Sequence, residues 1–276
     1  MAGRKNHSTA GTGPARRRLG LGIDIGGTGI KGALVDLDDG SLASDRVRID
    51  TPQPATPAAV AKTVGEVAGQ LEHTGRVGVT FPGVVMHGTV QTAANVDSSW
   101  VGTSLTDTLT PVLAGPVIAL NDADAAGLAE VRYGAGEDRS GLVIMVTLGT
   151  GIGTALIHDG ILVPNAELGH LEIDGHDAEK RASVSARERR DMSWHQWARH
   201  VQRYLRQLEK LLWPELFILG GGVSKQPDKW FDEITTRTPR VIARLANNAG
   251  IVGAALAAAE AGSPARSGGA RQQDES

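Results

Sequence analysis

The chain has 276 residues, enough for one or two domains, and its 41% hydrophobic content and net charge of −3 are typical of a globular protein. It contains no cysteine, which excludes disulfides, thiolate metal sites and cysteine nucleophiles. No apolar run is long enough to span a bilayer, and residues 1–18 lack the apolar core of a secretory signal. We therefore expect a cytoplasmic protein with no membrane partner.

Residues 1–18 are rich in Gly, Ser, Thr and Arg and carry no acid, so we expect a disordered basic tail. Residues 262–276 are polar and predict a second disordered tail. Strand-like apolar runs and helical segments lie between the tails, which indicates an α/β fold. We expect a smaller α/β lobe over residues 19–120, completed by a C-terminal helix at 248–261, and a larger α/β lobe over residues 121–247.

The most informative stretch joins two predicted strands through glycines. An apolar run at 19–25 contains Asp24 and leads into a loop that we expect to bind phosphate, made of Gly26, Gly27, Thr28 and Gly29 and followed by Lys31. The spacing satisfies the G-x-G-x-x-G pattern of dinucleotide sites, but those sites need a helix directly after the glycines. Residues 32–37 are β-rich and end in a turn signal. The loop therefore predicts a β-hairpin whose backbone N–H groups form an anion nest.

A second hairpin of the same kind lies further along the chain. The buried-strand run 142–146 leads into a loop with the candidate phosphate ligands Thr147, Gly149, Thr150, Gly151 and Gly153. Either loop alone is compatible with a flexible turn. Together they indicate two related lobes that each hold part of a polyphosphate chain. Gly220, Gly221 and Gly222 follow a third buried strand and would let the backbone approach a phosphorylated ligand closely.

Polar residues also follow the predicted strand at 117–120. Asn121, Asp122 and Asp124 open the next helix, and ligands collect where a strand of an open α/β sheet ends and a helix begins. Asn and Asp are preferred N-caps as well, which offers a purely structural explanation. Only one residue can occupy the cap, so at least one acid at this edge is not explained by capping.

Glu167 and His170 have the E-x-x-H spacing that binds two metals when it occurs on paired helices. There is one copy, beside Gly169 and without a second carboxylate motif, so we reject a di-metal site. His170 is then either a structural histidine or a polar ligand contact, and the pattern leaves this open. Asn95, Asp97 and Trp100 are further possible ligand contacts, with ordinary loop chemistry as the alternative.

The segment 180–210 carries nine Lys or Arg residues against three acids. Helical spacing puts Trp, Val and Leu side chains on one buried face and four cations on the other: Arg199, Arg203, Arg206 and Lys210. A solvated helix face usually mixes signs, whereas this row has one sign and suits a linear polyanion such as polyphosphate. The alternatives are a merely solvated face, or a polyphosphate track over Lys180, Arg181 and residues 187–190.

In their order along the chain, these motifs resemble the repressor/ORF/kinase (ROK) family of sugar kinases. The matching motifs are Asp24–Lys31, Phe81–Gly83, Asn121–Asp122, Leu148–Gly153, Glu167–His170, Gly220–Gly222 and Asn248–Gly250. The resemblance implies the actin/Hsp70/hexokinase-type (ribonuclease H-like) fold, in which two α/β lobes close over a sugar, and a homodimer. Most members carry a Cys-rich zinc motif after the Gly-His pair. This chain has the cysteine-free stretch Gly175–Lys180 there, which implies no zinc and resembles the polyphosphate-using branch.

The resemblance also implies roles for individual residues. Asp122 resembles the catalytic base that takes the proton of the glucose 6-hydroxyl, and Asp24 resembles the acid that organises Mg²⁺ and its waters. The implied sugar contacts are Gly83, Asn121, Asp122, Glu167, His170 and Glu179. The two hairpin loops resemble the phosphate loops, and Gly221 with Gly222 resembles the nucleotide-side loop. The implied reaction transfers the terminal phosphoryl group of polyphosphate or ATP to glucose and gives glucose 6-phosphate.

Two other interpretations compete with this one. A kinase that uses only ATP and acts on another hexose, such as mannose or fructose, would share every motif, and only the one-signed basic face argues against it. A non-catalytic, sugar-sensing repressor of the same family would need a DNA-binding domain before the first hairpin. Eighteen residues are too few for one, so we expect no nucleic-acid partner.

Overall fold

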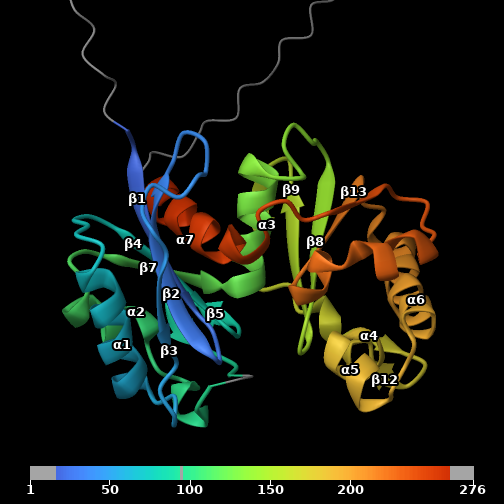
Figure 1. Ribbon diagram of the computed structural model, residues 1–276, viewed down its shortest axis with the longest axis horizontal. Helices are drawn as coiled ribbons and strands as arrows, with labels where there is room; N and C mark the ends of the chain where they lie inside the picture. Colours follow the sequence, from blue (N-terminus) through green and yellow to red (C-terminus); the bar gives the residue numbers. More distant parts are fainter. Residues whose placement is uncertain (1–16, 94–95, 262–276) are drawn as a thin grey trace, which may run out of the picture.

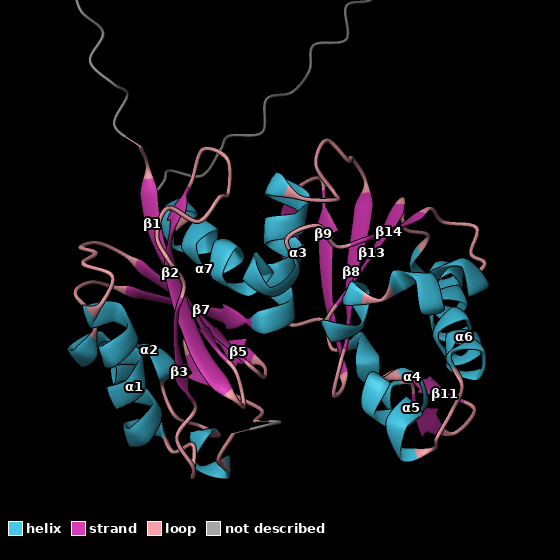
Figure 2. Ribbon diagram, viewed as in Figure 1, coloured by secondary structure: helices cyan, strands magenta, loops and turns pink. Residues whose placement is uncertain are grey.

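The computed structural model describes residues 17–93 and 96–261. The predicted tails, apart from residues 17 and 18, and Asn95 lie outside this part of the chain. Two five-stranded sheets stand side by side, with helices α3 (Asp122–Tyr133) and α7 (Ala249–Glu260) between them (Figures 1 and 2). Within the described residues, no helix has both the length and the apolar character that crossing a bilayer requires.

The first sheet has the strand order β3-β2-β1-β4-β7. Its strands are β1 (Leu19–Ile25), β2 (Gly29–Asp36), β3 (Val47–Asp50), β4 (Val77–Phe81) and β7 (Val117–Asn121). β1 and β2 are antiparallel and pair Asp24 with Lys31, so the first glycine-rich loop joins two strands as predicted. β4 runs parallel to both β1 and β7. The carboxyl ends of β1, β4 and β7 therefore lie at one edge of the sheet, next to this loop.

Two helices cover the outer face of the first sheet: α1 (Pro57–Gly69) and α2 (Leu105–Leu109) (Figure 1). α1 begins after Thr56, whose hydroxyl accepts a hydrogen bond from the first turn, and a proline occupies that turn. Its buried face packs Val60, Val64 and Val67 into the core of this lobe. A short hairpin follows β4 and is formed by β5 (Val85–Met86) and β6 (Thr89–Val90).

The second sheet has the strand order β10-β9-β8-β13-β14. Its strands are β8 (Leu142–Leu148), β9 (Ile152–His158), β10 (Ile161–Val163), β13 (Leu216–Gly220) and β14 (Arg240–Ile242). β8 and β9 are antiparallel, so the second predicted hairpin also forms, and β13 runs parallel to β8. The second glycine-rich loop and the start of the third glycine cluster thus lie on neighbouring strands.

The outer side of the second lobe carries α4 (Glu179–Ala182), α5 (Val184–Arg189), α6 (Trp194–Leu212) and the hairpin of β11 (Glu172–Ile173) and β12 (His176–Asp177) (Figures 1 and 2). A capping box between Ser193 and Gln196 starts α6. Its apolar stripe buries Trp197, Val201 and Leu205, as the spacing predicts. α6 therefore stays in place through its apolar face, and its cations lie on the solvent side.

The two lobes share a third core cluster, to which β2, α3, β8, β9 and α7 contribute apolar side chains. α7 packs unusually close to its neighbours. A Cβ added at Gly78 of β4 would lie 1.8 Å from the Ala254 carbonyl oxygen, and one at Gly253 of α7 would lie 1.8 Å from that of Ala125. Only glycine allows backbones to approach in this way. The C-terminal helix is therefore fixed against the first sheet and against α3 at the same time.

Candidate active site

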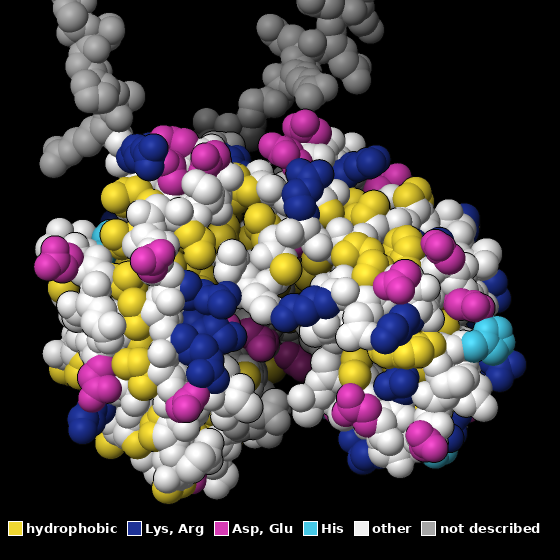
Figure 3. Space-filling model, in the orientation of Figure 1, with side chains coloured by type: hydrophobic (Ala, Val, Ile, Leu, Met, Phe, Trp, Pro, Cys, Tyr) yellow, Lys and Arg dark blue, Asp and Glu magenta, His cyan; other side chains and the backbone are white. Residues whose placement is uncertain are grey.

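A cleft separates the two lobes, with acidic side chains at its floor and Lys and Arg side chains along its rim (Figure 3). β1, β4 and β7 end at this cleft from the first lobe, and α3 begins there. This is the position at which open α/β sheets bind ligands.

Asn121 is the N-cap residue of α3. Its Oδ1 accepts hydrogen bonds from Ala123 N at 2.8 Å and from Asp124 N at 3.2 Å, while its Nδ2 donates to the Gly83 carbonyl oxygen at 3.1 Å. The cap therefore also ties α3 to the Pro-Gly turn after β4. Asp122 is not needed as the cap, and only the Ala123 N–H, at 2.8 Å, donates to its carboxylate.

Asp122 is exposed to water at the start of α3, but the protein packed around it still desolvates its carboxyl. Its enclosure by the protein, followed by the negative charges of Asp24 and Glu167, raises its pKa to about 7. A carboxylate with a pKa near neutral pH is suited to accept a proton during a reaction. The family resemblance implies that this residue is the base, and the local electrostatics are compatible with that role.

Asp24 lies at the end of β1 and faces the same cleft. Its Oδ1 accepts a hydrogen bond from the Thr80 hydroxyl at 2.7 Å, and its Oδ2 lies 3.5 Å from Lys31 Nζ. Within residues 17–93 and 96–261, no three His, Asp or Glu side chains are grouped to hold a metal. Mg²⁺ commonly needs only one or two protein carboxylates, with water and substrate phosphates as its other ligands. The single carboxylate of Asp24 is therefore enough to bind Mg²⁺ in this way.

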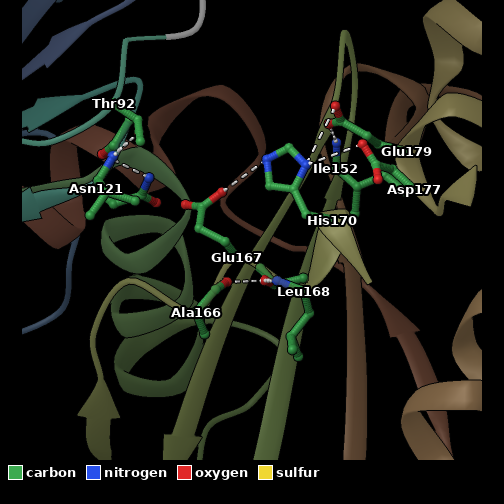
Figure 4. Close-up of polar contacts among 12 residues, drawn as sticks. Thr92, Asn121, Ile152, Ala166, Glu167, Leu168, His170, Asp177 and Glu179 are labelled. Atoms are coloured by element: carbon green, nitrogen blue, oxygen red, sulfur yellow. Dashed lines mark hydrogen bonds and ion pairs between the residues drawn. The ribbon is translucent and has the colours of Figure 1, made fainter. Parts of the chain in front are cut away.

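His170 stands between three carboxylates (Figure 4). Its Nε2 lies 3.9 Å from Glu167, and its Nδ1 lies 3.8 Å from Asp177 and 3.9 Å from Glu179. These distances exceed hydrogen-bond length, and the His170 side chain is 58% exposed. It is therefore no satisfied core histidine, and no described residue forms a hydrogen bond with its ring nitrogens, which are available to a polar ligand.

Asp177 is a member of this cluster that the sequence analysis missed. It falls in the stretch where the zinc motif of the family is absent, so the motif comparison offered no counterpart for it. The only sequence signal was the spacing of three residues between Asp177 and Lys180, which allows an ion pair. In the structure, the charged groups of these two residues lie 3.0 Å apart. That ion pair and the neighbouring His170 lower the pKa of Asp177, so it stays ionised.

The second glycine-rich loop lies against Glu179 and against the third glycine cluster. Ile152 N donates to Glu179 Oε2 at 3.4 Å, so this carboxylate contacts both the His170 cluster and the loop. Gly221 has φ +85°, and a Cβ there would lie 2.3 Å from the Leu148 carbonyl oxygen. Glycine is therefore required at this contact. The fold brings two of the three predicted phosphate segments together.

The first glycine-rich loop is held by side chains from β3 and from the residue after it. Thr51 Oγ1 donates to the Gly26 carbonyl at 2.5 Å, and Arg48 Nη2 donates to the Thr28 carbonyl at 3.3 Å. Arg48 also pairs with Asp50 at 2.7 Å, so its charge is partly neutralised. Sequence analysis did not single out Arg48, because a basic residue alternating with apolar ones on a strand is usually only solvent-exposed.

The four cations predicted as a polyphosphate track do not line the cleft. α6 lies on the outer side of the second lobe, far from the gap between the sheets (Figure 1). Arg203 pairs with Asp174, and Arg206 Nε donates to the Thr235 carbonyl at 3.1 Å. Glu209, the acid next to Lys210, is buried on the other side of α6, and its carboxylate accepts a hydrogen bond from Thr238 N.

A model of the ROK family matches residues 20–184, more than half of the chain, and spans both glycine-rich loops and the Glu167–His170 motif. This chain belongs to the ROK family. The polyphosphate glucokinase of Mycobacterium tuberculosis is 56% identical to it over 246 residues, which cover 89% of this chain and 93% of that protein. The predicted resemblance to the polyphosphate-using branch is confirmed.

Two solved kinase structures are similar to this chain over most of its length. The inorganic polyphosphate/ATP-glucomannokinase of Arthrobacter sp. strain KM is 55% identical, with a TM-score of 0.84 over 88% of this chain and 99% of that one. A ROK family glucokinase from Streptomyces griseus, solved with glucose and AMPPNP, is 26% identical, with a TM-score of 0.74 over 88% and 100%. The predicted two-lobed fold class is confirmed.

Proposed function

We propose that this protein is a kinase that transfers the terminal phosphoryl group of polyphosphate or ATP to the 6-hydroxyl of glucose. The similarity to polyphosphate glucokinases and to a polyphosphate/ATP-glucomannokinase supports this reaction class. The observation that carries the proposal is the state of Asp122. It is not the N-cap of α3, it lies close enough to Asp24 and Glu167 for their charges to act on it, and its pKa is about 7.

In the proposed reaction, Asp122 accepts the proton of the 6-hydroxyl as its oxygen bonds to the terminal phosphorus. The bond between that phosphorus and the bridging oxygen breaks, and the donor leaves as ADP or as a polyphosphate chain one unit shorter. The transition state of phosphoryl transfer is loose, so positioning and charge neutralisation supply most of the catalysis. The base is most important late, when the attacking hydroxyl loses its proton.

We assign the sugar contacts to the residues that surround Asp122 on the second-lobe side and at the Pro-Gly turn. These are Gly83, Asn121, Glu167, His170 and Glu179. We assign the donor phosphates to the two hairpin loops and to Gly221 and Gly222. Asp24 would hold Mg²⁺, directly or through water, and the ion would neutralise charge on the phosphates. Water could replace the sugar as nucleophile, so closure of the lobes must exclude it.

A screen of donors and acceptors tests this function. Purified protein is supplied with glucose, mannose or fructose, each with ATP or with long-chain polyphosphate, and the sugar phosphate formed is measured. We expect glucose 6-phosphate with both donors. Turnover with ATP alone, or with another hexose in place of glucose, would favour the ATP-dependent hexose kinase. The absence of product in every combination would leave the non-catalytic sugar-sensing role.

Mannose is the most plausible second acceptor, because the similar Arthrobacter protein is a glucomannokinase. Mannose and glucose differ only in the orientation of the 2-hydroxyl, and a site discriminates such isomers when it binds that group. If both sugars are accepted, equal kcat/KM values would mean that no side chain of the site contacts the 2-hydroxyl productively. A strong preference for glucose would indicate a direct contact.

We also propose that the protein works as a cytoplasmic homodimer with Mg²⁺ and without structural zinc. The stretch that replaces the zinc motif has no thiolate, and His176 Nδ1 lies 2.9 Å from the guanidinium of Arg181, a contact that disfavours a bound cation. Metal analysis of protein purified without added zinc should find no stoichiometric zinc. Sedimentation analysis should give twice the mass of the chain. One tightly held zinc per chain, or a monomer, would overturn the respective proposal.

A further inference from the structure

Four of the residues assigned to the sugar site, Gly83, Asn121, Asp122 and Glu167, come from three separate segments of the chain. Gly83 follows β4, Asn121 and Asp122 begin α3, and Glu167 lies in the loop after β10. The segments belong to different lobes, so something must hold them at fixed distances for the site to exist. Asn121 performs part of this task through its bond to Gly83. Two side chains without a proposed role, Asp124 and Asn165, complete the connection.

Asp124 is a buried acid in the first turn of α3, with only 1% of its surface exposed. Its Oδ2 accepts a hydrogen bond from the backbone N–H of Asn165 at 2.8 Å. Its Oδ1 has no partner among the described residues. Burial, and to a lesser degree the charge of Glu167, raises the pKa of this carboxyl to about 6. Burying a carboxylate with a free oxygen opposes folding, so stability alone gives no reason for an acid here.

Asn165 carries the connection across the cleft. Its side-chain oxygen accepts from Val85 N at 3.1 Å, and its side-chain nitrogen donates to the Val85 carbonyl at 3.0 Å. The amide thereby imitates the reciprocal bonding of two antiparallel strands. Asn165 has φ +59°, a conformation that Asn tolerates better than most residues. Val85 belongs to the hairpin after β4 in the first lobe, whereas Asn165 lies in the second.

The bonds therefore form one frame around the site. Asn165 lies two residues before Glu167, Val85 lies two residues after Gly83, and Asp124 lies two residues after Asp122. Gly83, Asp122 and Glu167 thus each have a neighbour two positions away that is bonded to another of the three segments. A shift of any one segment would move its sugar contact relative to the other two.

We propose that Asp124 and Asn165 are positioning residues of the sugar site. Asp124 fixes the loop of Asn165 to α3, and the Asn165 amide fixes that loop to Val85 of the other lobe. Neither side chain is assigned a contact with sugar or donor. This inference rests on the proposed function, because it names what sets the geometry of that same site. The donor loops are outside the frame, so the frame governs binding of the sugar and not of the donor.

The proposal is tested by the kinetics of three single variants and of the double variant that combines Asp124→Ala with Asn165→Ala. Asn165→Ala and Asp124→Ala should each raise the KM for glucose by roughly tenfold, because a displacement of a few tenths of an ångström already weakens oriented contacts. The KM for ATP should change by less than about twofold in both variants. Asp124→Asn keeps an acceptor oxygen for Asn165 N and should retain near wild-type kinetics. The double Ala variant should be no worse than the more impaired single variant.

Gln70→Ala serves as the matched control, because it also removes one side-chain amide bond, to Glu66 O at the end of α1, away from the cleft. It should change neither KM. Hydrogen exchange at Val85 N provides a readout that needs no activity, and exchange should accelerate in Asn165→Ala but not in the control.

Several outcomes would overturn the proposal. Equal rises in the KM for glucose and for ATP would indicate a general structural role. Unchanged glucose kinetics, or unchanged exchange at Val85, would show that the bond across the cleft does not set the site. A protein without any sugar kinase activity that still loses Val85 protection in Asn165→Ala would sink the proposed function while leaving the frame in place.

Discussion

At the scale of single residues, Asp122 differs from Asp24 and Asp124 because its side chain does not hold another segment of the chain in place. Asn121 caps α3, Asp124 holds the Asn165 loop, and Asp24 bonds Thr80. Asp122 is left with one N–H donor, and its burial, followed by the negative charges of Asp24 and Glu167, raises its pKa to about 7. The sequence could show that one acid at this edge exceeded the needs of capping. It could not show which acid, because that depends on how each side chain turns.

The pH dependence of the reaction follows from this pKa. Only ionised Asp122 can accept a proton, so kcat/KM for glucose should rise with pH and level off above about pH 7. Below the bend, the rate should fall about tenfold per pH unit. Rates measured with ATP at constant ionic strength would check this. A profile that is flat from about pH 5 to about pH 8 would mean that no such base is needed.

Ionisation of Asp122 should raise activity as the pH rises, but it should lower the stability of the fold. The folded pKa of Asp122 is raised above its unfolded value of 3.8, so its favourable contribution exists at low pH and is lost as pH rises through about 7. Asp122→Asn cannot ionise and should therefore have a higher Tm than wild type at about pH 8, but not at about pH 4. Thermal unfolding at both pH values is the measurement. A lower Tm of the variant at the higher pH would contradict the proposed electrostatics.

At the scale of elements, both glycine-rich hairpins could be predicted because their signals are local. An apolar run, a glycine loop and a second apolar run are adjacent in sequence and in the sheet. The bonds of Asn165 to Val85 could not be predicted, because these residues are 80 positions apart and one partner is backbone. The ion pair of Arg203 with Asp174 and the bond of Arg206 to the Thr235 carbonyl could not be predicted either, because each partner lies 29 positions away.

The close packing of α7 against β4 requires glycine at position 78, and this requirement can be tested. A Cβ at Gly78 would lie 1.8 Å from the Ala254 carbonyl oxygen, so Gly78→Ala must push α7 away from the sheet. We expect a loss of at least about 1–3 kcal/mol in the free energy of unfolding, the usual cost of overpacking. Gly69→Ala in α1 is the control, because its Cβ would meet nothing within 4 Å. The free energies of unfolding of both variants are measured by urea denaturation. Equal values for the two variants would contradict the close packing of α7.

The basic face of α6 remains a prediction for polyphosphate binding. Arg203 and Arg206 already have protein partners, so changing them would disturb the fold as well. Within the described residues, Arg199 and Lys210 have no ion pair or side-chain hydrogen bond. Changing both to Gln should raise the KM for long polyphosphate several-fold and flatten its salt dependence, as loss of counterion release requires. The KM for ATP should not move, because ATP is too short to reach this face from the cleft.

Equal effects on both donors would assign α6 a general supporting role. If neither donor is affected, the face is merely solvated, and the chain of phosphates runs elsewhere. The remaining cations of the segment, Lys180 and those at 187–190, would then be the next candidates.

At the scale of the whole molecule, the lobes are joined in two ways. The third core cluster ties β2, α3, β8, β9 and α7 together through apolar contacts, and the Asn165 amide adds polar bonds beside the proposed sugar site. The cleft lies between these connections and the rim of Lys and Arg (Figure 3). An acceptor at the floor and a donor entering from the rim would meet at Asp122. The sequence motifs predicted which segments take part, whereas the frame that aligns them emerges only from the fold.

The most direct test of this account is the turnover of Asp122→Asn with glucose and polyphosphate, measured beside the binding of glucose by calorimetry. The amide fills the same space and cannot accept the proton. We expect glucose binding close to that of wild type and turnover reduced by roughly 10²-fold or more. A variant that binds glucose and keeps most of its turnover would contradict the assignment of Asp122 as the base, and with it the central claim.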